Sequence, residues 1–393
     1  MSAGGDCHTC VQVVKSGPMN RILPAALRLT AVAAAAFWLA SCSAGSAPDT
    51  APGARVVNVY NWSDYIAPDT IRNFEKEYGI KVNYDVYDAS EVVDAKLLAG
   101  SSGYDVIFHS NQNAVRLTPL GIFRKLDYSR FENTHHLDRE ILAKTSLYED
   151  LQGYSVPYMW GSTGYAWNAD MVRRRLPGHE MNSADVLFDP DVIAKVADCG
   201  VSLLDSPSDI FPMVLAYLGR DPNAVDAENV AAAEAQLDLI RPYVRYFNST
   251  KMISDLPNKE VCVAMSWSGD YAQASARAEE AGIDIDLRYT MPKEGSALWV
   301  DGMFIPTDAP HARNAYLFID YIMRPEVTAS ISNYIFYANA NKSSQPLLNP
   351  RVANDPGIYP DEESWELLYP VLPVEPKLER LRTRAMARVR SGI

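Results

Sequence analysis

Val59-Tyr60-Asn61-Trp62-Ser63-Asp64-Tyr65 continues the run Arg55-Val56-Val57-Asn58, and together they predict a buried strand that ends near Trp62. Pro68 then opens a predicted helix and Gly79 ends it, because proline suits a first helical turn and glycine suits the residue after the last one. In open α/β sheets ligands lie outside the carboxyl ends of the strands, so the residues from Trp62 onward are candidate ligand contacts. Taken alone, the stretch favours a plainer interpretation, a turn whose two aromatics belong to the core.

Length and composition predict a soluble globular protein. The 393 residues, 48% of them hydrophobic, can bury a substantial core, and the length favours two domains over one. The formal net charge is −13. Such a charge argues against nucleic acid or an anionic surface as partner and is compatible with a cationic ligand.

The N-terminal region has the layout of a secretory signal. An apolar run over residues 29–40 follows two arginines and is too short for a transmembrane span. The run closes on Leu39-Ala40-Ser41-Cys42, which resembles the lipobox of bacterial lipoproteins, where the cysteine is acylated and becomes the mature N-terminus. We therefore expect residues 1–42 to be the signal region, with translation starting at Met19, and residues 43–54 to be a flexible tether.

Two pairs of cysteines have different interpretations. Cys7 and Cys10 have a redox-like or metal-like spacing, but they lie in a segment that is removed or never made. Cys199 and Cys262 remain in the exported part, where two leftover cysteines are more often bridged than free. We expect a disulfide between them, and the alternative is two buried free thiols.

Strands and helices alternate after the first helix. Strands are predicted over residues 80–87 and 104–110, with a helix from about residue 90 to residue 98 between them. This alternation implies a parallel sheet. Ser110 would then leave the third strand at the same sheet edge as Trp62.

Two Pro-containing segments predict crossings between lobes. Pro157-Tyr158-Met159-Trp160-Gly161 is expected to be extended and is followed by a predicted strand over residues 163–167. A second crossover is expected at residues 289–295. The C-terminal run 378–389 spaces Leu378, Leu381 and Met386 among four arginines, which favours a solvated basic helix face.

A second strand end repeats the features of the first. The apolar strand 261–265 ends in Ser266-Trp267-Ser268-Gly269-Asp270-Tyr271, which again delivers a tryptophan, a carboxylate and a tyrosine. Asp209 follows the helix-start signature Ser206-Pro207-Ser208, where most carboxylates serve only the helix dipole. Two such strand ends in one chain favour a shared cleft.

Aromatic side chains and carboxylates recur at the predicted strand and helix ends. Aromatic faces cover methylene groups and attract a cation, and carboxylates accept charge-assisted hydrogen bonds from ammonium groups. The combination therefore suits an alkyl chain that carries ammonium groups. The aromatics are Trp62, Tyr65, Trp267, Trp299 and Tyr337, and the carboxylates are Asp64, Asp209, Asp270 and Asp301.

Four stretches carry a resemblance to a known family, namely residues 60–70, Pro157-Tyr158-Met159-Trp160, residues 336–341 and Pro356-Gly357-Ile358-Tyr359-Pro360. With them the chain resembles, over nearly all of residues 57–392, the putrescine- and spermidine-binding proteins of bacterial ABC polyamine importers. The resemblance implies an α/β, two-lobed periplasmic binding protein of type II, the Venus-flytrap fold. In that fold the polyamine lies in a cleft between the lobes, among aromatics and carboxylates.

The resemblance also implies which residues contact the ligand, and the chain departs from the family pattern at a few positions. Asp209 stands where glutamate is usual, His109 where proline is common, and Gly302 where a larger apolar residue is common. Trp299 occupies a place that varies between phenylalanine and tryptophan, so the preference between putrescine and spermidine stays open. The implied contacts are Trp62, Ser63, Asp64 and Tyr65 in the first loop, Ser110, Asp209, Trp267 and Asp270 in the middle, and Trp299, Asp301 and Tyr337 in the last part.

Lobes, partners and location follow from the same resemblance. Lobe 1 is expected to comprise residues 55–157 and 292–345, and lobe 2 residues 158–291 and 346–393. We expect a monomer, lipid-anchored in the periplasm or cell envelope, that captures a polyamine and hands it to the permease of an ABC transporter. No cofactor, metal or nucleic acid is expected.

Other functions remain as alternatives. The chain could bind another organic cation, such as agmatine or a basic amino acid, or it could be a polyamine sensor. An enzyme is disfavoured. Asp105, His109 and Ser110 are close in sequence, but neighbours on a strand face opposite sides and no nucleophile-elbow motif is present.

Overall fold

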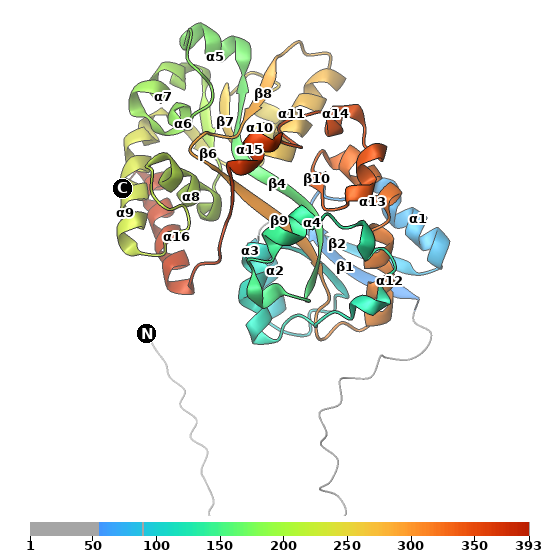
Figure 1. Cartoon of the computed structure of the whole chain (residues 1–393). Helices are drawn as coiled ribbons and strands as arrows, with labels where there is room; N and C mark the ends of the chain where they lie inside the picture. Colours follow the sequence, from blue (N-terminus) through green and yellow to red (C-terminus); the bar gives the residue numbers. More distant parts are fainter. Residues whose placement is uncertain (1–54, 89, 393) are drawn as a thin grey trace, which may run out of the picture. The chain divides into compact units, whose positions relative to one another are not determined.

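The computed structural model describes residues 55–88 and 90–392 (Figure 1). The signal region, Cys42 and the tether lie outside the described residues. The strands are β1 (Val56–Trp62), β2 (Lys81–Tyr87), β3 (Val106–Ser110), β4 (Ser155–Asn168), β5 (Val201–Leu203), β6 (Val244–Phe247), β7 (Val263–Trp267), β8 (Leu287–Thr290), β9 (Ser296–Phe304), β10 (Ala338–Asn339) and β11 (Leu368–Pro370). The α-helices are α1 (Pro68–Tyr78), α2 (Ser90–Leu98), α3 (Asn111–Leu117), α4 (Arg139–Thr145), α5 (Ala169–Arg175), α6 (Asp185–Phe188), α7 (Pro190–Val196), α8 (Pro207–Tyr217), α9 (Ala227–Ile240), α10 (Met252–Asp255), α11 (Ser268–Glu280), α12 (Ala312–Ile322), α13 (Pro325–Ile335), α14 (Pro350–Ala353), α15 (Glu362–Glu366) and α16 (Pro376–Ser391).

The first strand-to-helix unit forms as its sequence predicts. Strand β1 ends at Trp62, and Pro68 occupies the first turn of α1. Gly79 follows the helix in the left-handed conformation, with φ at 62°, and its N–H bonds the carbonyl of Glu75. Glycine adopts this conformation without a Cβ penalty, so the helix ends where the sequence places the stop signal.

A mixed sheet joins two parallel parts through an antiparallel centre, in the order β2-β1-β3-β9-β4-β7-β5-β6. Strand β1 pairs in parallel with β2 and β3, as predicted, and β5 pairs in parallel with β6 and β7. Strands β4 and β9 run antiparallel across the middle (Figure 1). Because β3 pairs with β9 and β7 pairs with β4, the carboxyl ends of β3 and β7 both lie along this central pair.

The predicted Pro-containing crossing is part of one long strand. The segment at residues 157–161 and the strand expected at residues 163–167 both belong to the 14-residue β4. The sequence suggested a break because proline cannot donate a ladder hydrogen bond. The strand accommodates Pro157 with a register shift against β9 between Pro157 and Trp160. The lobe boundary predicted at residues 157–158 would therefore fall inside a continuous strand, and the lobe ranges remain a prediction.

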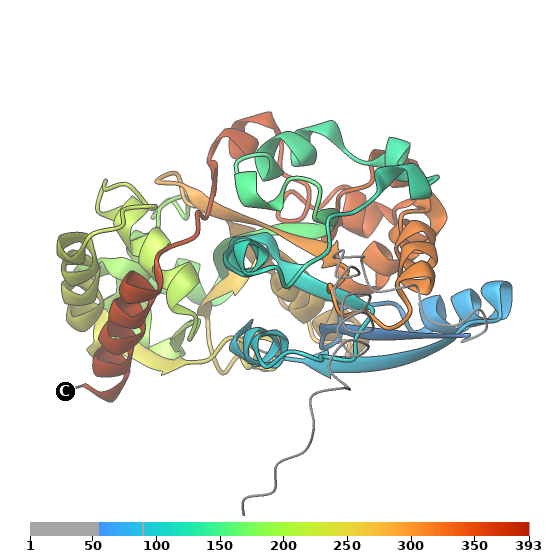
Figure 2. The same ribbon diagram turned by 90° about the horizontal axis from the view of Figure 1, so that it is seen from below.

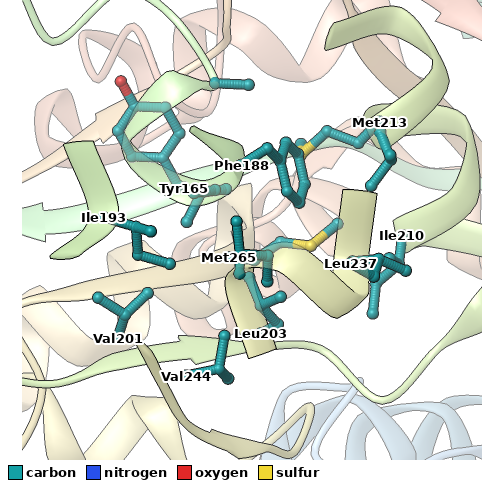
Figure 3. Close-up of a cluster of buried hydrophobic side chains, with 14 of the residues drawn as sticks. Tyr165, Phe188, Ile193, Val201, Leu203, Ile210, Met213, Leu237, Val244 and Met265 are labelled. Carbon is teal, nitrogen blue, oxygen red and sulfur yellow. The ribbon is translucent and has the colours of Figure 1, made fainter. Parts of the chain in front are cut away.

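Separate apolar cores support the two parallel parts of the sheet. One core gathers side chains from β4 to β7 and the helices around them, including Tyr165, Phe188 and Met265 (Figure 3). Another packs β1 and β3 against α1, α12 and α13, with Phe74 and Phe318 in edge-to-face contact at 5.1 Å. Trp267 packs against both cores, so this indole stands at the junction of the two parts.

The predicted disulfide is confirmed. Cys199 and Cys262, which are 63 positions apart in sequence, are bridged, with their Cα atoms 5.5 Å apart. Both residues are buried in the core that surrounds β5 and β7. The bridge closes a long loop, which restricts the unfolded chain.

The C-terminal helix differs from its prediction at one arginine. Leu378 and Met386 of α16 are buried, as an apolar face requires, but Arg382 is also buried, with only 2% of its surface exposed. Its guanidinium donates a hydrogen bond to the carbonyl of Ala224, and burial lowers its pKa. The sequence predicted a solvated basic face because helical periodicity alone cannot tell which arginine packs against α8 and α9.

Within residues 55–88 and 90–392, no helix is both long enough and apolar enough to cross a bilayer.

Candidate functional site

Asp270 occupies the first turn of α11, directly after β7. Its Oδ1 atom accepts a hydrogen bond of 2.6 Å from the hydroxyl of Tyr337, a contact between residues 67 positions apart. The carboxyl is 7% exposed, and burial raises its pKa to about 6, although the bond from Tyr337 opposes that shift. The N-cap residue of α11 is Trp267, and this helix start has no side-chain capping bond. Asp270 therefore bonds a residue far away in sequence and is not the cap of its own helix.

Gly269 allows the Tyr337 ring to lie directly on the start of α11. A Cβ atom at this position would come within 2.3 Å of the ring, far below van der Waals contact. The close approach of ring and backbone fixes the Tyr337 hydroxyl over Asp270. A glycine immediately before a carboxylate thus serves the geometry of the site.

Asp301 is the second buried carboxyl, in the middle of β9. It pairs in register with Ser110, the last residue of β3. The residue is 6% exposed, and burial raises the pKa of its carboxyl to about 7, with the Tyr65 hydroxyl opposing the shift. In turn, burial and the charge of Asp301 raise the pKa of Tyr65 well above its usual value. The Tyr65 hydroxyl has no hydrogen bond of normal geometry within the described part of the chain.

Asp209 lies in the first turn of α8, as its helix-start signature predicts, and its carboxylate has three hydrogen-bond donors. Oδ1 accepts from the hydroxyl of Thr163 at 2.8 Å and from the indole N–H of Trp267 at 3.0 Å. Oδ2 accepts from the hydroxyl of Ser206. Asp209 therefore joins α8 to β4 and β7 and fixes the Trp267 indole, which goes beyond the helix-dipole role.

The three carboxyls are neighbours through two shared tyrosines. Burial raises the pKa of Tyr289 and of Tyr337, and carboxylate charges add to both shifts: those of Asp209 and Asp270 act on Tyr289, and those of Asp270 and Asp301 act on Tyr337. Residues from α8, α11 and β9 thus come together at the centre of the sheet. None of these three carboxyls forms an ion pair with a lysine, arginine or histidine of the described chain.

Aromatic rings enclose the buried carboxyls. The ring of Tyr337 lies 5.5 Å from that of Tyr65 and 5.3 Å from that of Trp299, both at steep angles. Tyr158 meets Tyr65 edge to face at 5.5 Å, and its hydroxyl bonds the Tyr65 carbonyl. Gly161 makes room for Trp299, because a Cβ atom there would lie 2.4 Å from the indole.

The remaining predicted contacts lie around this centre. Trp62 is half-buried and packs on Tyr87 with ring centroids 4.4 Å apart, and the N–H of Ser63 bonds the Tyr87 carbonyl. Ser110 is buried and accepts a hydrogen bond from Asn113. Asp64 differs from the other carboxylates because it is exposed and has a left-handed backbone, with φ at 53°. The structure therefore does not bring Asp64 into the buried group.

Sequence reasoning missed Tyr289 and Thr163 as members of the site. Both reach it through strand pairing: Thr163 of β4 pairs with Trp267, and β8 brings Tyr289 beside β4. No local pattern marks either residue. Tyr158 could have been found, because it lies in a stretch that carries the family resemblance.

The structure separates the residues of the enzyme alternative. His109 bonds Asp94 at 2.9 Å through Nε2, whereas Asp105 pairs with His311 at 3.0 Å. Ser110 has Asn113 as its partner, so these residues form no nucleophile–base pair. The residues that the structure describes also contain no group of three metal-ligating side chains.

Comparisons with known proteins match this fold over most of the chain. The bacterial extracellular solute-binding protein family matches residues 69–360. The putrescine-binding periplasmic protein PotF of Escherichia coli strain K12 is 41% identical over 362 residues, covering 90% of this chain and 98% of PotF. The putrescine-binding periplasmic protein SpuD of Pseudomonas aeruginosa strain UCBPP-PA14 is 43% identical over 357 residues, covering 90% of this chain and 97% of SpuD.

The fold also matches a solved structure, that of a spermidine/putrescine ABC transporter protein from Listeria monocytogenes. The TM-score is 0.76 at 27% sequence identity, and the match covers 86% of this chain and 100% of the other. The predicted fold class, the α/β two-lobed periplasmic binding protein, is confirmed. The chain therefore belongs to the bacterial extracellular solute-binding proteins, a family of binding proteins rather than enzymes.

Proposed function

We propose that this chain captures a polyamine, putrescine or spermidine, outside the cytoplasmic membrane and delivers it to the permease of an ABC transporter. The observation that carries the proposal is the pair of buried carboxyls, Asp270, which accepts a hydrogen bond from Tyr337, and Asp301. An ionised carboxylate without a positive partner is costly to bury. A ligand with two or more ammonium groups joined by methylenes would supply that partner.

The aromatic rings fit the rest of such a ligand. Tyr65, Tyr337 and Trp299 form a contiguous group whose faces can cover methylene groups and attract an ammonium. The Tyr65 hydroxyl, which lacks a normal hydrogen bond, can accept one from an ammonium N–H. Asp209 acts mainly by holding Trp267, because its carboxylate already has three donors.

The proposal also covers where the protein works and how it closes on its ligand. Relatives that are named periplasmic putrescine-binding proteins support export, and Cys42 would anchor the chain through a lipid. The predicted lobes, residues 55–157 with 292–345 and residues 158–291 with 346–393, would close as a monomer around the ligand. Closure follows if the ligand makes more contacts with the closed form than with the open one.

Calorimetric titration tests the function directly. Putrescine, spermidine, cadaverine, agmatine and arginine would each be titrated into the exported protein at fixed pH and salt. We expect saturable binding of putrescine or spermidine, and weak binding of arginine, whose carboxylate would meet the buried acids. No heat with either polyamine would refute the proposal, and agmatine as the tightest ligand would favour another organic cation.

Asp270→Asn links the binding to the site. Asparagine keeps the shape and can still accept the Tyr337 hydrogen bond, but it removes the charge, so polyamine affinity should fall. Asp238→Asn is the matched control, because Asp238 is an exposed carboxylate on α9. Equal affinity in the wild type and in Asp270→Asn would show that the polyamine binds elsewhere.

A further inference from the structure

A hollow of about 350 Å³ lies between α3 and α16, formed by none of the residues assigned to the polyamine. Figures 1 and 2 both place α16 opposite α3. Arg116 supplies the α3 side of the lining. The α16 side consists of Pro376, Glu379, Arg380, Thr383 and Arg384.

The two arginines that α16 contributes to the hollow have no charged partner among the described residues. Arg380 and Arg384 are exposed and take part in no ion pair or side-chain hydrogen bond with another described residue. They are four positions apart on one helix, so they face the same way and repel each other. By contrast, Arg388 of the same helix binds Glu234 through two hydrogen bonds of 2.6 and 2.8 Å.

Arg116 completes the cluster from the other side. Asp94 at 3.2 Å and Asn113 at 2.9 Å hold its guanidinium in place. Glu379 is the one carboxylate in the lining. In a chain with a formal net charge of −13, the three arginines outnumber the two carboxylates beside them, Glu379 in the lining and Asp94 next to Arg116, so the local charge is positive.

We propose that Arg116, Arg380 and Arg384 form a second binding site, which takes a small oxyanion carrying phosphate or carboxylate groups. A guanidinium presents paired N–H donors whose geometry matches these groups. The volume lies within the roughly 300–1,000 Å³ of small-ligand pockets. The site would also explain why two like charges persist on adjacent turns of α16 without a protein partner. This ligand class differs from polyamines, so the proposal does not depend on the function proposed above.

Inorganic pyrophosphate is the probe, titrated calorimetrically into the full-length mature protein at constant ionic strength. The wild type should show saturable binding. Arg380→Gln with Arg384→Gln should weaken it by at least about tenfold, because two of the three charge-assisted donors are removed. Arg116→Gln should weaken it as well, since the site spans both helices. Arg388→Gln, which removes a charge from the same helix outside the hollow, should leave it unchanged.

Vesicles distinguish a soluble anion from a lipid headgroup. Binding to phosphatidylglycerol vesicles that pyrophosphate displaces, and that the double variant abolishes, would support the site and identify the headgroup as its occupant. Pyrophosphate binding without vesicle binding would support a soluble anion. Absence of binding in both assays, or an equal loss in Arg388→Gln, would overturn the proposal. The two exposed arginines have no protein partner to lose, so unchanged melting curves will verify that the double variant is folded.

Discussion

Replacing Asp301 by asparagine is expected to weaken polyamine binding and, at the same time, to stabilise the ligand-free protein. Asparagine has nearly the same shape but cannot ionise. Asp301 is 6% exposed and has no ion pair within residues 55–88 and 90–392. Its charge is therefore unfavourable in the empty protein and becomes favourable when an ammonium group arrives.

The loss of affinity follows because the Asp301 carboxylate and the ligand's ammonium group would form a charge pair that is shielded from water. Removing one partner of such a pair typically costs about 2–5 kcal/mol, because the other charge is left unpaired. At about 1.4 kcal/mol per decade, Kd should rise by roughly 30-fold to several thousand-fold.

The gain in stability follows from the raised pKa. The carboxyl has an ordinary value of 3.8 and a value of about 7 in the folded protein. Between these values the unfolded chain has lost a proton that the folded chain keeps, so the stability of the wild type falls as pH rises through this window. A shift of about three units corresponds to at most about 4 kcal/mol, which the asparagine variant would not lose.

Two measurements test the reasoning together. Melting curves without ligand at pH 4, 6 and 8 should show the variant gaining stability relative to the wild type as pH rises. Calorimetry with putrescine and spermidine at pH 8 should show the loss of affinity, and Asp238→Asn should change neither quantity. A variant that binds polyamine normally would refute the role of Asp301, and a variant less stable than the wild type at pH 8 would refute the account of its burial.

Four further predictions concern other parts of the chain. Burial raises the pKa of Asp270 to about 6 and that of Asp301 to about 7, so polyamine affinity should increase with pH up to about 8. Below that pH, binding should release protons, and titration in buffers of different ionisation enthalpy measures this release. Trp299→Phe should weaken spermidine more than putrescine, because a smaller ring covers less of the longer chain, and equal losses in calorimetry would remove the argument. Reduction of the Cys199–Cys262 bridge, which spans 63 positions, should cost up to about 4 kcal/mol in urea unfolding, whereas two free thiols in the exported protein would contradict the bridge. Mass spectrometry of the mature N-terminus should find an acylated Cys42, and an unmodified residue beyond it would contradict the anchor.

The sequence by itself determined the features that depend on neighbouring residues. Pro68 and Gly79 set the ends of α1, and the alternation of strands with helices predicted the parallel pairing of β1 with β2 and β3. The ends of β1 and β7 were recognisable because tryptophan and tyrosine follow an apolar run in each. These signals are local, since capping and side-chain periodicity act over a few residues.

Only the tertiary structure decided which side chains share the site and what each carboxyl does. Asp270 meets a tyrosine 67 positions away, and Asp209 is saturated by donors from Thr163 and Trp267, whereas Asp64 stays exposed although the same resemblance singled it out. The burial of Arg382 was equally beyond the helical pattern. Burial, strand register and the pKa of a buried acid depend on groups far away in sequence, and those groups become neighbours only when β4 and β9 join the two parallel parts of the sheet.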